Sequence, residues 1–350
     1  MTTEIKSDPL LPDNWPSAWP ENTCSGLLKA QPEDFRVYEI PLVEPEGEGE
    51  HIWLHIVKRG ANTAWIAGNI ARLAQVKDMD VGYAGLKDRH AVTSQWFSIY
   101  LPERAMPEGG IDFSLLNNDE CQVVQVTRHV RKLRRGDLQG NRFEICIRHI
   151  EGDRAALESN LSSIQQFGFP NYFGKQRFGH DGGNLTQGLA MLKREIRVRN
   201  RNKKSLYLSA VRSWLFNRVL AARVTKGQWH SLLEGDLADE KGLPTGPLWG
   251  RGRSALSGQA LALETEELSD SAEILDALEH AGLSQERRSL VVMPTDMSWQ
   301  WLESEPDVLN VCFTLEPGAY ATGLLSEVLS LREPERLDIM PEQADKESGE

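Results

Sequence analysis

The sequence predicts an α+β protein with two domains. Residues 33–40 and 51–58 alternate in part between apolar and polar side chains and are rich in β-branched and aromatic residues, which predicts strands. Residues 62–74 instead repeat their apolar side chains at helical spacing. Helices and strands follow one another without a regular strand-helix-strand repeat, and this favours an α+β fold over a doubly wound parallel sheet.

The pattern of the first half of the chain predicts one such domain of mixed helices and strands. We expect the strands at 33–40 and 51–58 to pair across the acidic, turn-rich residues between them. Asn62 and Thr63 offer a cap for the helix that follows. The predicted elements, in order, are strands at 33–40 and 51–58, a helix at 62–74, strands at 95–100 and 143–147, and a helix at 156–164.

The sequence changes in character at Gly168, which indicates a second domain. Glycine and asparagine become dense, and a long helical pattern follows. We expect, in order, a glycine-rich segment up to Asn184, a helix at 205–224, loops around short strands at 232–262, a strand at 308–315, a helix through 324–328 and a frayed polar tail after Pro341.

Cysteine spacing and hydropathy exclude several classes of protein. Cys24, Cys121, Cys146 and Cys312 are far apart and include no Cys-x-x-Cys pair, so neither a zinc cluster nor a disulfide framework is indicated. The first residues lack the apolar core of a secretory signal, and no run approaches the ~18 apolar residues that a membrane helix requires. We therefore expect a cytoplasmic protein with reduced thiols.

The net charge of −12 argues at first against a nucleic-acid partner, because phosphates repel an acidic surface. The basic residues, however, are concentrated in two stretches. Residues 128–149 hold seven lysines and arginines against two acids, and residues 193–204 hold seven against one. Such a polarised chain can dock a phosphate backbone with its basic face. For either stretch alone, a solvated helix face is an equally good interpretation.

The most informative segment is GYAGLKDRHAVTSQWF at residues 82–97. A short apolar strand opens through two glycines onto Lys-Asp-Arg-His and returns to an aromatic strand. Glycines let the chain turn sharply and leave room for a ligand beside the carboxylate. Asp88 is therefore a candidate catalyst, and the alternative is a loop aspartate that bonds its own backbone.

Three segments, in the same order along the chain, resemble the signatures of the TruD family of tRNA pseudouridine synthases. They are KAQPEDF at 29–35, the segment at 82–97, and NYFGKQRFG at 171–179. The resemblance implies the pseudouridine synthase fold, with a mixed or antiparallel sheet and an inserted α/β TRUD domain. It implies a catalytic domain over residues 1–166, the inserted domain over 167–307, and a return to the catalytic domain with a polar tail over 308–350.

Members of this family isomerise uridine by breaking the N1–C1′ bond, turning the base and rejoining it through C5. The isomerisation is redox-neutral, so neither a cofactor nor a metal is implied. By resemblance Asp88 is the catalytic carboxylate, which either adds to the sugar carbon or removes the C2′ proton; the sequence does not choose between the two. Lys29 matches the family's basic position and is expected to pair with Asp88. The alternative is an exposed surface lysine.

A uridine in folded RNA must leave its stack, and an aromatic side chain can replace the lost stacking. By resemblance, Phe35, Phe143 and Tyr320 are aromatic positions of the substrate pocket, and Asn141 is its base-recognising amide. Without the resemblance, Phe35 and Phe143 are core aromatics on strands and Asn141 is a turn residue. Tyr320 departs from the phenylalanine that the family often has, and its hydroxyl could alter how the base is held.

The segment 171–179 combines aromatics, glycines and two cations, which suits stacking and phosphate contacts with RNA. A domain-joining turn with buried aromatics is the alternative. The cations of this segment, those beside Asp88 and those at the start of the 128–149 stretch are the expected RNA contacts: Lys87, Arg89, Arg131, Lys132, Arg134, Arg135, Lys175 and Arg177.

The sequence thus predicts a cofactor-free tRNA pseudouridine synthase, an isomerase. By resemblance it modifies uridine-13 in the D arm; we expect tRNA as its partner and a monomer. Two other classes of function stay open. One is a catalytically silent RNA-binding or RNA-chaperone protein that keeps the basic face. The other is a metal-dependent nuclease that uses Asp88 and His90, although no metal-ligand spacing such as His-x-x-x-His accompanies them.

Overall fold

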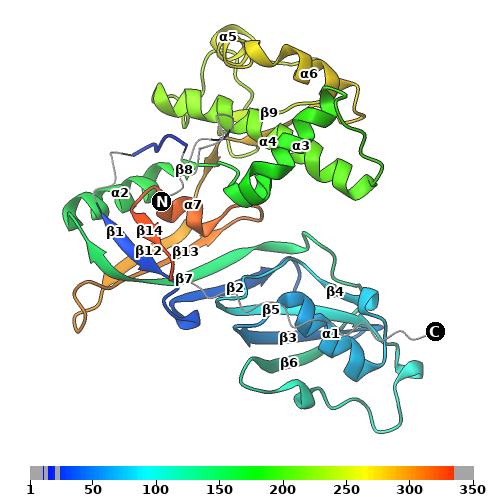
Figure 1. Ribbon diagram of the computed structural model, residues 1–350. Coiled ribbons are helices and arrows are strands. Elements are labelled where there is room, and N and C mark those ends of the chain that lie inside the picture. Colours follow the sequence, from blue (N-terminus) through cyan, green and yellow to red (C-terminus); the bar gives the residue numbers. More distant parts are fainter. Residues whose placement is uncertain (1–10, 12–14, 20–23, 335–350) are drawn as a thin grey trace, which may run out of the picture.

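The structure, a computed structural model, describes residue 11 and residues 15–19 and 24–334. Figure 1 shows two bodies: an extended β-sheet with helices packed against it, and a mainly helical domain above the sheet. The fold is α+β, as predicted. The expectations for the first residues of the chain and for the tail after Pro341 lie outside the described residues.

Within the described residues the main sheet has ten strands, and its path runs β12-β13-β7-β2-β5-β3-β6. The pairs β2–β5 and β1–β14 are parallel and the other pairs are antiparallel, so the sheet is mixed. Its strands are β1 (Ser25–Leu28), β2 (Phe35–Pro41), β3 (His51–Arg59), β4 (Val81–Tyr83), β5 (Val92–Tyr100), β6 (Cys121–His129), β7 (Leu138–Glu151), β12 (Thr295–Trp301), β13 (Leu309–Leu315) and β14 (Ser330–Arg332).

The long strand β7 joins the two halves of the sheet. It pairs with β2 over residues 138–145 on one side, and with β13 over residues 141–147 on the other. Its last residues pair with β1. Two helices, α2 (Arg154–Phe167) and α7 (Ala321–Ser326), close the core on this half of the sheet. The core therefore buries side chains from both ends of the described chain.

The other half of the sheet is covered by α1 (Thr63–Ala74), the helix predicted from its apolar stripe. Ile66 and Ile70 of this helix are buried against strands β3 and β5. The expectation that β2 and β3 pair was wrong, because β5 lies between them. Residues 93–99 of β5 are all buried. A strand without a solvent-facing side belongs in the interior of a covered sheet.

The inserted domain leaves the sheet at β8 (Phe169–Pro170) and returns at β11 (Val291–Val292), and these two short strands pair with each other. The next strand, β12, already pairs with β13 in the main sheet. The domain boundary expected at residue 308 assigned β12 to the inserted domain. Its sequence, TDMSWQW, has no valine or isoleucine and includes an aspartate, a residue depleted in strands, so its strand signal is weak.

The helical domain has its own core, centred on α4. In α4 the residues Leu208, Val211, Leu215 and Val219 lie on one face at helical spacing, and all are buried. The helices are α3 (Gly183–Leu192), α4 (Arg201–Thr225), α5 (Gly258–Glu267) and α6 (Ala272–Glu279), and β9 (Thr245–Leu248) pairs with β10 (Glu286–Ser289). The described 3₁₀ helices are η1 (Pro32–Asp34), η2 (Asp78–Asp80), η3 (Glu103–Ala105), η4 (Phe113–Leu116), η5 (Lys175–Phe178), η6 (His180–Gly182) and η7 (Ser269–Ser271).

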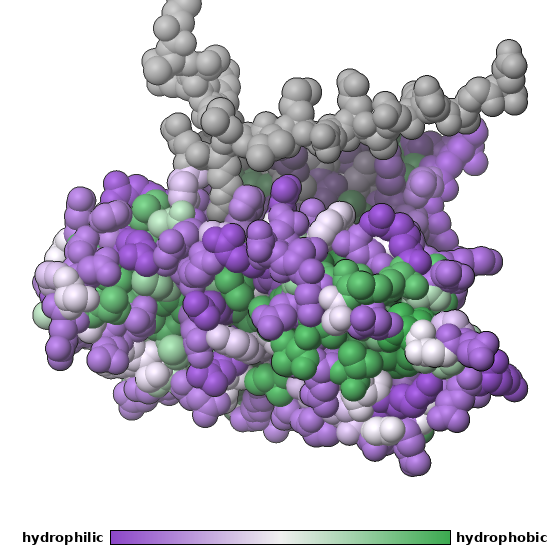
Figure 2. Space-filling view, turned by 90° about the horizontal axis from the view of Figure 1, so that it is seen from below, coloured by the Kyte–Doolittle hydropathy of each residue, from purple (hydrophilic) through white to green (hydrophobic). Residues whose placement is uncertain are grey.

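The face seen from below in Figure 2 is mostly hydrophilic but carries an apolar patch. On this side of the molecule β6 forms the edge of the sheet, with Val124 and Val126 exposed. A register shift opposite His55 and Ile56 interrupts the strand, as is common where an edge must not pair with another chain. The four cysteines form no disulfide. In the described part of the chain, no helix has the length and apolarity needed to cross a membrane.

Gly82 sets the distance between strand β4 and the loop after β6, which we call the basic loop (residues 131–137). A Cβ on Gly82 would lie 2.2 Å from the backbone oxygen of Leu133 and 2.7 Å from Ser98 Oγ. The same Ser98 hydroxyl accepts a 2.9 Å hydrogen bond from the backbone N–H of Leu133. The glycine therefore lets the basic loop lie directly on β4.

Replacing Gly82 by alanine should lower the free energy of unfolding by roughly 1–3 kcal/mol, because the methyl group overlaps backbone that cannot move away without losing the Ser98 bond. Gly68→Ala is the matched control. Gly68 lies in α1, where an added Cβ has nothing within 4 Å, and a helical Gly→Ala change should stabilise the protein by about 1 kcal/mol. Urea unfolding measures both, and a Gly82→Ala variant as stable as the control would contradict this packing.

Candidate active site

A cleft of about 740 Å³ opens where β2 and β7 meet the loop before β5, the start of α7 and the first turn of the inserted domain. The loop, residues 84–91, is called the Asp88 loop below. Alternation along β2 and β7 points their odd-numbered residues at this side of the sheet. All six residues predicted for catalysis and substrate binding line the cleft: Lys29, Phe35, Asp88, Asn141, Phe143 and Tyr320.

Lys29 and Asp88 form an ion pair in the cleft, with Lys29 Nζ 2.9 Å from Asp88 Oδ2. The Asp88 side chain is 50% exposed and the Lys29 side chain only 10%, so the carboxylate faces the open cleft and the ammonium lies beneath it. Lys29 Nζ also lies 4.5 Å from the centre of the Phe35 ring and 3.7 Å from a carboxylate oxygen of Glu333. The expected pairing of Lys29 and Asp88 is thus present in the geometry.

The backbone of Lys29 is in the left-handed region, with φ at 56°. This conformation costs a residue other than glycine about 1–2 kcal/mol. Lys29 directly follows strand β1, whose pairing with β7 and β14 fixes its position. The strained residue therefore lies at the point where the sheet delivers an ammonium to Asp88.

Lys58 anchors the Asp88 loop from below. Its side chain is fully buried, and its Nζ donates to the backbone oxygens of Asp88, at 2.8 Å, and Ala61, at 2.7 Å. Burial lowers the pKa of Lys58 to about 8, against the opposing effect of the Asp88 charge. The amine is still mostly protonated at neutral pH, and a charged donor makes the stronger hydrogen bond.

Two further buried side chains hold the same loop. The Gln95 amide donates to the backbone oxygen of Gly85 at 3.2 Å, and Thr63 Oγ1 accepts from the backbone N–H of Lys87 at 3.1 Å. Thr63 also donates to Gln95, at 3.0 Å, so the two anchors support each other. Held in this way, the loop presents the Asp88 carboxylate to the cleft in one position.

Lys87 does not match its expected role as an RNA contact. Its Nζ lies 2.6 Å from Glu39 Oε2, and the two side chains are 5% and 1% exposed. The other oxygen of Glu39 accepts from the backbone N–H of Trp96. An ammonium enclosed in such a pair is not presented to a phosphate backbone. Lys87 instead ties the Asp88 loop to strand β2.

Asn141 lies on β7 with its side-chain oxygen buried and without a hydrogen-bond partner among the described residues. An unsatisfied buried acceptor is costly unless a ligand completes it. Uracil carries an N3–H donor between two carbonyl acceptors, and a side-chain amide offers the complementary acceptor and donors. The amide thus lies in the wall of the cleft with an acceptor that no described residue uses.

Phe35 and Phe143 border the cleft but belong mainly to the core, with 3% and 7% of their surfaces exposed. Their rings meet edge to face, with centroids 6.2 Å apart, and Phe143 stacks on Phe313 at 5.4 Å. Both rings are therefore core residues that also border the cleft, and their role in a substrate pocket stays a prediction. They can shape one wall of a base pocket while they stabilise the sheet.

Tyr320 is 43% exposed and lies just before α7, at the edge of the cleft next to the inserted domain. The preceding segment is tied to that domain by Arg288, which donates to the backbone oxygen of Gly318 at 3.1 Å. The guanidinium groups of Arg288 and Arg177 lie 4.4 and 5.2 Å from the Phe173 ring centre. Burial lowers the pKa of Arg288, and the charge of Arg177 adds to this effect.

The basic loop lies beside the cleft and is held by its backbone. Trp53 Nε1 donates to the oxygen of Arg131 at 2.9 Å, and the N–H of Gly136 donates to the oxygen of Ala84 at 2.8 Å. Its arginine side chains stay exposed. Of the expected RNA contacts, those with exposed side chains are Arg89, Arg131, Arg134, Arg135 and Lys175, while Lys132 and Arg177 are partly buried.

Sequence reasoning missed three residues that position the site: Glu39, Lys58 and Gln95. Each is a polar or charged residue on a strand of the main sheet, and each is buried. A charged residue at an inward position of a predicted strand is a usable signal, because buried charges need partners. Lys58, at the end of the alternating segment 51–58, carried that signal.

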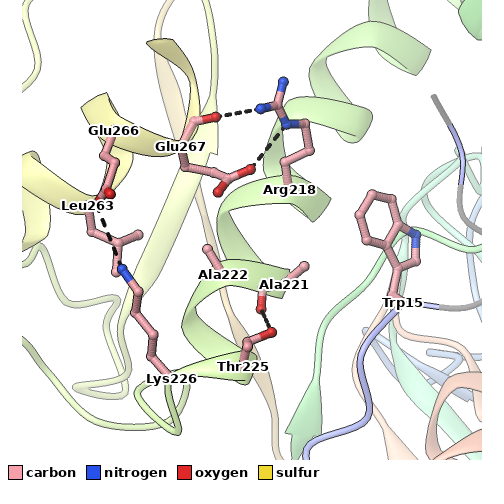
Figure 3. A pocket seen from close by; sticks show the side chains of 9 residues that line it. All are labelled: Trp15, Arg218, Ala221, Ala222, Thr225, Lys226, Leu263, Glu266 and Glu267. Carbon is pink, nitrogen blue, oxygen red and sulfur yellow. Dashed lines mark hydrogen bonds and ion pairs between the residues drawn. The ribbon is translucent and has the colours of Figure 1, made fainter. Parts of the chain in front are cut away.

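A separate hollow of about 440 Å³ lies in the inserted domain between α4 and α5, as Figure 3 shows. Its acids are already paired: Glu267 lies 3.2 Å from Arg218 Nε, and Glu266 lies 3.8 Å from Lys226. The remaining lining is largely apolar. None of the predicted site residues lines this hollow. Among the described residues, no three His, Cys, Asp or Glu side chains are grouped to hold a metal.

Comparison with known proteins identifies the family. The sequence model of the family TruD, tRNA pseudouridine synthase D, matches residues 18–200 of this chain. The chain is 46% identical over 340 residues to the tRNA pseudouridine synthase D of Methylococcus capsulatus, covering 91% of this chain and 94% of that protein. It is 46% identical over 320 residues to that of Cellvibrio japonicus, covering 91% and 93%.

A solved structure agrees in fold. The crystal structure of a Methanosarcina mazei protein assigned as tRNA pseudouridine synthase D (TruD) superposes with a TM-score of 0.69 at 21% identity, covering 90% of this chain and 95% of that one. At this identity the likeness concerns the fold alone. Since the family model matches and two relatives share 46% identity over nearly the whole chain, the protein belongs to the TruD family of tRNA pseudouridine synthases, which are isomerases.

Proposed function

We propose that this protein converts uridine-13 in the D arm of tRNA to pseudouridine, with Asp88 as its catalytic carboxylate. One observation carries the proposal. Asp88 is the half-exposed partner of an ion pair in a cleft that also offers an unsatisfied amide at Asn141. Family membership supports tRNA as the substrate class, and the position within tRNA rests on the resemblance of the motifs.

We propose a part in the reaction for each of these residues. Asn141 binds the uracil edge, and Phe35 and Phe143 form the wall against which the base lies. Asp88 then either attacks C1′ as the N1–C1′ bond breaks, or removes the C2′ proton to give a glycal. In both routes the detached base turns and C5 bonds to C1′. In the first route this displaces the Asp88 carboxylate from C1′, and in the second C2′ regains the proton that Asp88 had taken. C5 then loses its proton and N1 gains one, so the product is an isomer of the substrate. Lys29 supplies the positive charge that keeps the Asp88 carboxylate in place.

The atoms of substrate and product are the same, so we propose that no cofactor takes part. Tyr320 closes the edge of the cleft next to the inserted domain. We propose that Arg89, the basic loop, Lys175 and Arg177 contact RNA phosphates around the cleft, and that the enzyme acts as a monomer in the cytoplasm. We also propose that residues 1–166 and 308–350, together with β12, belong to the catalytic domain, and that the rest of the segment 167–307 is the inserted domain.

Asp88→Asn should lower pseudouridine formation by more than about a thousandfold and leave tRNA affinity within about twofold, because the amide keeps size and hydrogen bonding but cannot attack or deprotonate. Asp276→Asn, on the exposed surface of α6, is the control. Formation is followed on a tRNA transcript by carbodiimide labelling and primer extension, in excess EDTA. Near-normal turnover by Asp88→Asn excludes the proposed role, and intact tRNA in EDTA separates isomerisation from metal-dependent cleavage by Asp88 and His90.

Phe35→Ala should impair modification beyond its effect on folding. Phe313→Ala is the matched control, because Phe313 is buried in the same cluster, packs on Phe143 and does not line the cleft. Both changes should cost roughly 3–5 kcal/mol of stability. Melting temperature and turnover per folded molecule are measured together. If the two variants retain the same turnover per folded molecule, Phe35 is a core residue only.

Replacing Arg131, Lys132, Arg134 and Arg135 by alanine should weaken tRNA binding and flatten the dependence of log K on log[salt]. Each lost phosphate contact should reduce the slope by roughly 0.7–0.9. The backbone bonds of Arg131 and Gly136 hold the loop in either variant. A variant with lysine at the three arginine positions keeps the charge and should keep the slope. An unchanged slope in the alanine variant identifies the loop as a solvated face.

A further inference from the structure

We propose that a second hollow, on the outer side of the Asp88 loop, binds an unpaired nucleotide that neighbours the modified uridine in the RNA. This inference rests on the proposed function. The hollow, called the outer groove below, has a volume of about 510 Å³ and lies between α1, β4 and the basic loop. Residues that line it include Ala64, Gly68, Met79, Tyr83, Lys132 and Arg135.

The outer groove continues the active-site cleft. Tyr83 lines the groove and the next residue, Ala84, lines the cleft; likewise Arg135 lines the groove and Gly136 the cleft. The two chain segments are joined here by the Gly136 to Ala84 hydrogen bond. RNA bound in the cleft can therefore continue into the groove with a nucleotide that neighbours the modified uridine.

The lining of the groove matches both parts of a nucleotide. Its floor is small and apolar, formed by Ala64, Ala67 and Gly68 on consecutive turns of α1. Met79 is 76% exposed at the rim, and the polarisable side chain and the nearby Tyr83 ring suit the face of a base.

The opposite wall of the groove is cationic. Lys132, Arg134 and Arg135 line it, and within the described residues none of the three forms an ion pair. Asp78 is the acidic residue of the lining. Lys132 Nζ donates to the backbone oxygen of Met79 at 2.7 Å and keeps its charge. On a chain with a net charge of −12, three cations without an acidic partner among the described residues, beside an apolar floor, favour a ligand that is both flat and anionic.

A competing explanation is that the cations attract phosphates and the hollow itself stays empty. A substitution at Gly68 distinguishes these two explanations. A Cβ there meets nothing within 4 Å, so a larger side chain grows into the groove without disturbing the fold. The substitution removes no charge, and it replaces a glycine within a helix, which favours the helix. Filling the groove therefore affects binding only if a base occupies it.

The experiment measures the affinity of Gly68→Leu for an unmodified tRNA transcript, its single-turnover rate of pseudouridine formation, and its melting temperature. Ala64→Leu, one turn earlier on the same face of α1, is the second variant, and it does not depend on replacing a glycine. Ala262→Leu, at an exposed position of α5, is the control for an added apolar side chain.

We expect Gly68→Leu and Ala64→Leu to bind the transcript at least fivefold more weakly, with an unchanged or higher melting temperature, and Ala262→Leu to bind as the wild type does. Peptide mapping of UV-crosslinked complexes should place a crosslinked base within residues 78–83. If both groove variants bind the transcript with wild-type affinity, the outer groove is not a nucleotide-binding site, even if pseudouridine forms normally. Absence of pseudouridine with the wild-type protein instead overturns the proposed function, and the affinities still report on the groove.

Discussion

The hydrogen bonding of β7 to strands on both of its sides is the interaction on which the candidate site depends. On one side the register places Asn141 opposite Glu39 and Phe143 opposite Val37; on the other it places Asn141 opposite Leu315. A slip of one residue would turn the amide and the ring to the other face of the sheet. Strand β13, which pairs with β7, leads into the segment that carries Tyr320. Strand β1, which also pairs with β7, sets the position of Lys29.

The Asp88 loop adds a second constraint, because its backbone rests on buried charges. Lys58 and the Lys87–Glu39 pair lie almost without solvent contact beneath it. Burying charges is expensive and rarely improves stability over apolar packing. In this protein each of these groups fixes a part of one loop, and the half-exposed carboxylate of Asp88 is the part left facing the cleft. The left-handed backbone of Lys29 is likewise unfavourable in energy, and it too fixes the position of a side chain in the site.

Much of the fold could be predicted from local patterns. The helix α1, the strand β13 and the change of domain near Gly168 follow from periodicity and turn residues. The place of β5 between β2 and β3 could not be predicted, because strand order depends on contacts between distant segments. The strand β12 was missed because it has no valine or isoleucine and its strand signal is weak.

The candidate site, too, could be predicted from the sequence only in part. The residues that line the cleft could be named from motifs, since each motif falls on one of its walls. The burial of Lys87 could not, because an adjacent lysine and aspartate give no sign of which side chain turns inward. The outer groove depends on the meeting of α1, β4 and the basic loop, three segments that share no motif.

The central claim is that Asp88 and its cleft isomerise one uridine of tRNA. It is tested most directly by mapping pseudouridine across cellular RNA from cells with the protein, without it, and with its Asp88→Asn form in its place. We predict that one tRNA position loses pseudouridine without the protein, and that the Asp88→Asn form does not restore it. A pseudouridine map that is the same in all three would contradict the claim.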